Sequence, residues 1–164
     1  MLDRARTIAE QVTDPELPML TLADLGVLRS VCTEGDRVVV EIAPTYSGCP
    51  AVAEMRADLM SRLHGDGFAD VEVRVVLSPP WTTDDITARG RATLARHGVA
   101  PPGVRPHRPP GPVPLQLSHR LPAPPCPHCG SVDTEVTSAF GPTPCTALCR
   151  CRICAEPFEH MKAI

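Results

Sequence analysis

The chain has 164 residues, which allows one domain, or one domain with a small appendage. A formal net charge of −3 and an aromatic content of 3% argue against a nucleic-acid-binding surface, which needs positive charge and stacking side chains. No apolar run reaches membrane-spanning length, and the N-terminus lacks the apolar core of a signal peptide. We therefore expect a cytoplasmic protein that binds neither nucleic acid nor membrane.

The N-terminal residues predict a helix followed by a sharp turn. Apolar side chains recur at helical spacing over residues 2–12, and Pro15 and Pro18 end that pattern because proline cannot continue the hydrogen-bond ladder. Composition alone places Asp14 and Glu16 in a solvated turn.

Two strands, a helix and a third strand follow along the chain. Residues 27–33 and 37–43 predict an antiparallel hairpin, and residues 51–64 carry the apolar stripe of an amphipathic helix. Residues 71–77 alternate apolar and polar side chains, which is the pattern of a strand. A strand, a helix and a strand in this order predict a right-handed parallel crossover.

A last helix is expected from Thr82 or Thr83 to His97, where Gly98 ends it. Trp81, just before it, is interpreted as a hydrophobic lid on the sheet edge rather than a cofactor contact. Residues 1–100 therefore predict an α/β (α+β) unit, with a small mixed three-stranded sheet packed on helices.

Cys49 stands at the turn between the second strand and the long helix. Pro50 suits a first helical position, which would make Cys49 the N-cap, close to unpaired backbone N–H groups. A thiol there ionises more readily, and the thiolate is the form that binds metal or attacks an electrophile. The alternative is a small buried residue that fills the turn.

Residues 101–125 form a proline-rich linker. Ten of these 25 positions are proline, so the segment cannot make a packed core and is expected to be an extended, semi-rigid spacer.

The C-terminal part, residues 126–164, predicts a zinc ribbon. Six of the eight cysteines lie in it, and two CxxC pairs are typical of metal ligands, so we expect structural zinc. Strands are expected at residues 134–137 and 147–150, and His128 is expected to point outward. The four predicted ligands are Cys126, Cys129, Cys151 and Cys154. Two further thiols, Cys145 and Cys149, are left open as spare thiols, alternative ligands or part of an iron–sulfur site.

The chain resembles two related groups of proteins. The N-terminal part is similar to iron–sulfur-assembly accessory domains such as the T protein of the bacterial Suf system. The residues that carry this likeness are Asp14-Pro15-Glu16, Asp24-Leu25-Gly26, Thr45 and Ser47-Gly48-Cys49-Pro50. The whole chain apart from the linker resembles the D subunits of the phenylacetate-degradation system, through Pro79-Pro80-Trp81-Thr82, Gly90-Arg91, Gly98 to Pro102, Phe140 to Cys145 and Glu156-Pro157-Phe158.

The resemblance implies an accessory subunit of the phenylacetyl-CoA epoxidase system, acting in maturation of its iron or iron–sulfur centre rather than in epoxidation. Cys49 is then the reactive or cluster-holding thiol, and its flanking motif is Asp14, Pro15, Glu16, Thr45 and Ser47. The implied partners are the oxygenase or reductase subunits. Cys149 and Ala163 depart from the family pattern, where an aromatic residue and a cysteine are expected.

The residues themselves also favour a metal-handling protein over an enzyme. The sequence has neither the Glu-x-x-His pair of a di-iron site nor a glycine-rich dinucleotide fingerprint. Cys49 supplies a single ligand, so a cluster held there needs another thiol, from a homodimer or a partner. Two alternatives remain: a structural adaptor that docks oxygenase subunits through the ribbon, and a thiol enzyme that uses Cys49 as nucleophile.

Overall fold

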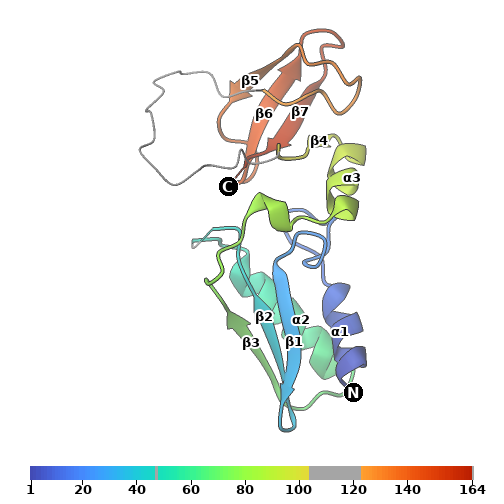
Figure 1. Cartoon of the computed structure of the whole chain (residues 1–164), viewed down its shortest axis with the longest axis vertical. Coiled ribbons are helices and arrows are strands. Elements are labelled where there is room, and N and C mark those ends of the chain that lie inside the picture. The colour runs from blue at the N-terminus through green and yellow to red at the C-terminus, as the bar shows by residue number, and fades with distance from the viewer. Residues whose placement is uncertain (47, 104–122, 164) are drawn as a thin grey trace. The chain divides into compact units, whose positions relative to one another are not determined.

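The structure is a computed structural model that describes residues 1–46, 48–103 and 123–163. The chain divides into two compact units, Met1–Thr93 and Leu94–Ala163, which are described separately (Figure 1). None of the helices described is long and apolar enough to cross a membrane.

The first unit contains a mixed three-stranded sheet, as the sequence predicts. Its strands are β1 (Leu28–Glu34), β2 (Arg37–Ile42) and β3 (Val71–Val75), in the order β1-β2-β3. The hairpin β1–β2 is antiparallel, whereas β2 and β3 are parallel, with Ile42 opposite Val75. The two parallel strands therefore end at the same edge of the sheet.

Two helices, α1 (Leu2–Glu10) and α2 (Val52–Gly65), pack against the sheet and each other (Figure 1). The predicted stripe of α2 is buried at Met55, Leu59 and Leu63. These side chains join the apolar core of the first unit, and three consecutive buried valines of β2 show that both faces of the sheet are covered there.

The segment Asp24-Leu25-Gly26 anchors the end of the first unit. The Trp81 indole N–H donates to the Leu25 carbonyl at 2.8 Å, and its ring is buried, which confirms a packing role for this tryptophan. Asp24 accepts hydrogen bonds from Thr87 at 3.2 Å and Arg89 at 2.6 Å. Asp24 and Leu25 therefore tie the segment that follows β3 to the N-terminal part of the first unit.

The predicted single helix from residue 82 to 97 is wrong, because the chain is extended at Ile86. A short 3₁₀ helix, η1 (Thr83–Asp85), comes first, and α3 (Ala88–Arg96) follows. The Thr87 N–H donates to the Asp24 carbonyl at 2.9 Å, a tertiary bond that replaces the helical one.

The second unit contains a four-stranded sheet in the order β4-β7-β6-β5. The predicted ribbon hairpin is β5 (Thr134–Ser138) with β6 (Thr146–Cys151). Two more strands, β4 (Val99–Ala100) and β7 (Pro157–Met161), were not predicted. Because β4 pairs in parallel with β7, residues 99–100 belong to the sheet of the second unit. The sequence predicts them instead at the end of the first domain, residues 1–100. Most of the predicted linker lies outside the described residues.

We expect Gly26→Ala to destabilise the first unit strongly. Gly26 has φ +69°, and an added Cβ would lie 2.4 Å from the Asp85 carbonyl oxygen. The left-handed backbone costs about 1 kcal/mol and the clash about 1–3 kcal/mol more. The matched control is Gly35→Ala. Gly35 has φ +62° and open space around it, so this change should cost only the backbone contribution of about 1 kcal/mol. Equal losses of unfolding free energy in the two variants would contradict this packing.

Candidate metal centre and thiol site

The four cysteines of the two CxxC pairs converge in the second unit. All four sulfur atoms lie within 4.8 Å of one another. The Cys126 and Cys154 sulfurs are 3.7 Å apart, and those of Cys129 and Cys151 are 3.6 Å apart. Four sulfurs at tetrahedral Zn–S bond length would be about 3.8 Å apart, so the donor set fits a structural zinc ion.

Each pair sits in a tight turn that directs backbone amides at the sulfurs. The residue after each pair, Gly130 or Ala155, has a positive φ, of 75° and 63°. The Cys154 N–H approaches the Cys151 sulfur at 3.5 Å. This turn is the physical reason that two thiols so close in sequence can face one metal.

Ionisation of all four thiols is electrostatically unfavourable without a cation. Hydrogen bonding from the Cys154 amide, opposed by burial, lowers the pKa of Cys151 to about 6. Hydrogen bonding from the Glu156 amide lowers the pKa of Cys154, but burial and the three neighbouring sulfurs outweigh it and raise that pKa to about 12. Four thiolates cannot all ionise at these distances unless a positive ion offsets their repulsion.

Cys145 and Cys149 lie outside this four-sulfur group. Cys149 packs with Phe158 and Ala100 in the core beside the cluster, and its burial raises the pKa of the thiol. Cys145 is also buried, and its sulfur lies 3.1 Å from the Thr143 hydroxyl. Among the described residues, the geometry favours packing over metal binding for both.

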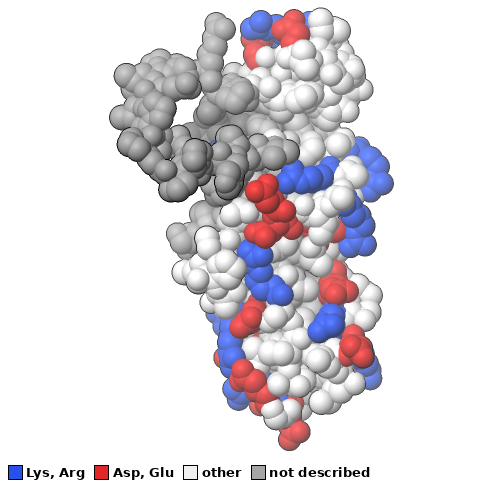
Figure 2. Space-filling view, in the orientation of Figure 1, with Lys and Arg blue, Asp and Glu red and all other residues white. Residues whose placement is uncertain are grey.

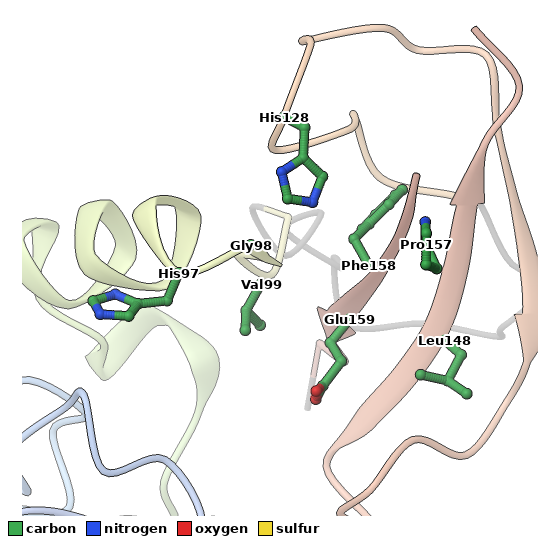
Figure 3. Close-up of a pocket in the computed structure, with 8 residues that line it drawn as sticks. All are labelled: His97, Gly98, Val99, His128, Leu148, Pro157, Phe158 and Glu159. Carbon is green, nitrogen blue, oxygen red and sulfur yellow. The ribbon is translucent and has the colours of Figure 1, made fainter. Parts of the chain in front are cut away.

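The exposed His128 is not part of the metal cluster and lines a shallow hollow of about 350 Å³ (Figure 3). The His97 side chain is directed away from the other polar groups in this view. The hollow therefore lacks the convergent polar groups that orient a small ligand. Its lining residues are His97, Gly98, Val99, His128, Leu148, Pro157, Phe158 and Glu159.

Cys49 lies in the first unit, in the connection that leaves the end of β2, and is partly buried. Its predicted N-cap position is wrong: α2 begins at Val52, and Ala51 is the N-cap. The Val52 N–H donates to the Cys49 carbonyl at 3.4 Å, so an additional turn separates the thiol from the helix. The first amide of α2 is therefore already paired, and the helix begins three residues beyond Cys49.

Asp14 is buried, with 5% of its surface exposed, so its predicted place in a solvated turn is wrong. One carboxylate oxygen accepts the N–H groups of Glu16 and Leu17, both at 2.8 Å. Burial raises the pKa of Asp14, these two N–H groups lower it, and the charge of Glu54 raises it further. Composition could not reveal this burial, because it depends on the packing of the turn beside α2 in the folded chain.

The acidic turn lies beside the first turns of α2. Glu54, which the sequence did not single out, acts electrostatically on Asp14 from the beginning of that helix. A small hollow there is lined by Thr13, Pro15, Glu54, Met55 and Asp58. The structure therefore brings the Asp14-Pro15-Glu16 motif to the helix that Cys49 precedes. Thr45 lies partly buried in the same connection, and Ser47 lies outside the described residues.

Comparison with known proteins identifies the family. The chain is 40% identical over 158 residues to a protein of Escherichia coli (strain K12) that is named as the D subunit of 1,2-phenylacetyl-CoA epoxidase, and the match covers 96% of this chain and 90% of that protein. The chain belongs to the family of phenylacetyl-CoA epoxidase D subunits. Family models agree: residues 3–75 match "Iron-sulfur cluster assembly protein", and residues 111–162 match "PaaD zinc beta ribbon domain".

Two further relatives match the first unit of this epoxidase family member. "Fe-S protein maturation auxiliary factor YitW" of Bacillus subtilis (strain 168) is 32% identical over 88 residues, covering 52% of this chain and 84% of that one. The crystal structure of a domain of unknown function, DUF59, from Bacillus anthracis has a TM-score of 0.52 at 26% identity, and the match covers 57% of this chain and 90% of that one. The α+β fold of the first unit is thereby shown.

We expect Ala155→Gly to stabilise the metal-loaded second unit by about 0.5–1 kcal/mol, because glycine adopts a positive φ without steric cost. The reciprocal change, Gly130→Ala, should destabilise it by about 1 kcal/mol. Zinc affinity, measured by chelator competition, reports both effects because folding and metal binding are coupled. Tighter zinc binding by Gly130→Ala would contradict the turn geometry.

We expect the Asp14 carboxyl in the folded protein to titrate above the ordinary value of 3.8, because burial disfavours its charged form. Its raised pKa means that this carboxyl favours folding most at low pH, and that this contribution is lost as the pH rises through the folded-state pKa. Carbon-detected NMR titration measures the value directly. Glu54→Gln should lower it, and a wild-type value at or below 3.8 would contradict the burial.

Proposed function

We propose that this chain is a maturation factor for the iron or iron–sulfur centre of a phenylacetyl-CoA epoxidase, and that Cys49 is the thiol that handles the cargo. The oxygenase or reductase subunits would be its clients. The observation that supports this most is the joining, in one chain, of an iron–sulfur-assembly unit and the ribbon of an epoxidase subunit.

The two units supply different kinds of thiol. The four ribbon sulfurs are close enough to saturate a zinc ion, which leaves no coordination position for a transferred ion. Cys49 has no second cysteine within its own connection and can contribute one ligand. A single thiolate suits temporary binding, because the client or a second copy must complete the coordination.

The Asp14 turn supports the same site. The buried Asp14 carboxylate, which interacts electrostatically with Glu54, adds negative potential at the first turn of α2, the helix that Cys49 precedes, and this favours a cation at that end of the helix. Asp14 is held by backbone amides that are independent of cargo, so this potential is present before any iron arrives.

Cys49→Ser should lower the iron content and activity of the client several-fold while leaving the fold intact. Oxygenase and reductase are produced with the wild-type chain, with Cys49→Ser, or without the chain, and iron and phenylacetyl-CoA turnover are measured. The matched control is Cys32→Ser, which changes the other partly buried cysteine of the first unit, on β1. Full iron and full activity without this chain would overturn the proposal.

A structural adaptor is the second candidate function. Exposed aliphatic side chains beside the cysteine turns favour it: Val132 is 81% exposed and Ile153 is 69% exposed. In that case Cys49→Ser would be silent, whereas Cys126→Ser would abolish the complex. Comparing these two variants in the same co-purification separates the candidates.

A further inference from the structure

Two charge-free segments meet at one end of the first sheet. One segment, residues 42–53, runs from the last residue of β2 to the start of α2. The other, residues 75–83, runs from the last residue of β3 to the start of η1. Neither segment contains Asp, Glu, Lys or Arg. At the chain's overall 21% of charged residues, 21 positions would hold about four. The absence of charge is therefore local to these two connections.

Parallel pairing places both segments at the same edge of the sheet. Ile42 lies opposite Val75, and the Val76 N–H donates to the Ile42 carbonyl at 2.9 Å. The Cys49 connection and the segment after β3 therefore leave the sheet side by side. In open sheets with parallel strands, this carboxyl edge is where binding sites form.

Apolar side chains in these segments are exposed to solvent. Leu77 is 62% exposed and Val75 is 39% exposed, and Pro50, Pro79 and Pro80 are exposed as well. Figure 2 shows uncharged surface where the chain continues beyond β3, whereas the Arg37–Asp70 ion pair lies at the other end of that strand. These exposed apolar side chains, in a segment that leaves the sheet beside the Cys49 connection, favour contact with a protein.

We propose that the surface formed by residues 75–80 with residues 48–50 docks the client oxygenase through an apolar, charge-poor face of that protein. The inference rests on the proposed function and adds the surface that brings the client's metal site to Cys49. Nucleic acids and other polyanions are disfavoured as occupants, because the surface offers no cation to pair with them. Contact through apolar groups also predicts weak dependence on salt.

Binding of purified iron-free oxygenase to the full chain tests this surface. Leu77→Arg and Leu77→Asp should each raise the dissociation constant at least tenfold, because either charge would be buried against an apolar face. The control is Ala69→Arg, an equally drastic change at an exposed position just before β3, at the opposite end of that strand from Leu77, which should leave binding unchanged. The wild-type constant should change less than about threefold between 50 and 300 mM salt.

Several outcomes would overturn the proposal. These are no binding by the wild-type chain, unchanged binding by both Leu77 variants, or tighter binding by one of them, which would mean a charged client face. A dimer that the Leu77 variants dissolve, seen by analytical ultracentrifugation without oxygenase, would assign the surface to a second copy.

The docking surface and the maturation role can be rejected separately. Cys49→Ser should bind oxygenase as the wild type does, since the thiol is a small part of the surface. Loss of iron delivery in Cys49→Ser, together with normal binding by the Leu77 variants, would retain the proposed function and reject this docking surface. Loss of binding by the Leu77 variants, with full iron delivery by Cys49→Ser, would retain the docking surface and reject the role of Cys49.

Discussion

Parallel pairing of β2 and β3 is the constraint on which the first unit depends. It requires a crossover through α2, and it places the ends of both strands at one edge. The Cys49 connection, the beginning of α2 and the exposed Leu77 segment all leave that edge. The Asp14 turn reaches the same helix from the N-terminal side through its electrostatic contact with Glu54. The pairing therefore brings the Cys49 connection and the apolar Leu77 segment to one edge, and the buried carboxylate reaches the adjoining helix independently.

The second unit depends on a different constraint, the repulsion among four sulfurs. The turns at Gly130 and Ala155 bring the four thiols close together, and burial with the neighbouring sulfurs raises the pKa of Cys154. A bound cation removes that repulsion, so metal binding supplies folding energy to a module with little core of its own. A zinc ion held by all four sulfurs has no open coordination position, which fits a structural role for the ribbon.

The sequence predicted the features that depend on local pattern. Alternation marked β3, an apolar stripe marked α2, and CxxC spacing marked the four converging cysteines. It missed features set by tertiary contacts. The burial of Asp14 depends on the packing of its turn beside α2, the break before α3 depends on the Asp24 carbonyl, and β4 has only two residues, too few for any periodicity.

The most direct test of this division of labour is the zinc, iron and acid-labile sulfide content of the full chain purified anaerobically, compared with Cys126→Ser and Cys49→Ser. We predict about one zinc per chain, lost in Cys126→Ser and kept in Cys49→Ser, and iron or sulfide only in preparations with an intact Cys49. Iron and sulfide that persist in Cys49→Ser but disappear in Cys126→Ser would contradict it, because the ribbon would then hold the cluster.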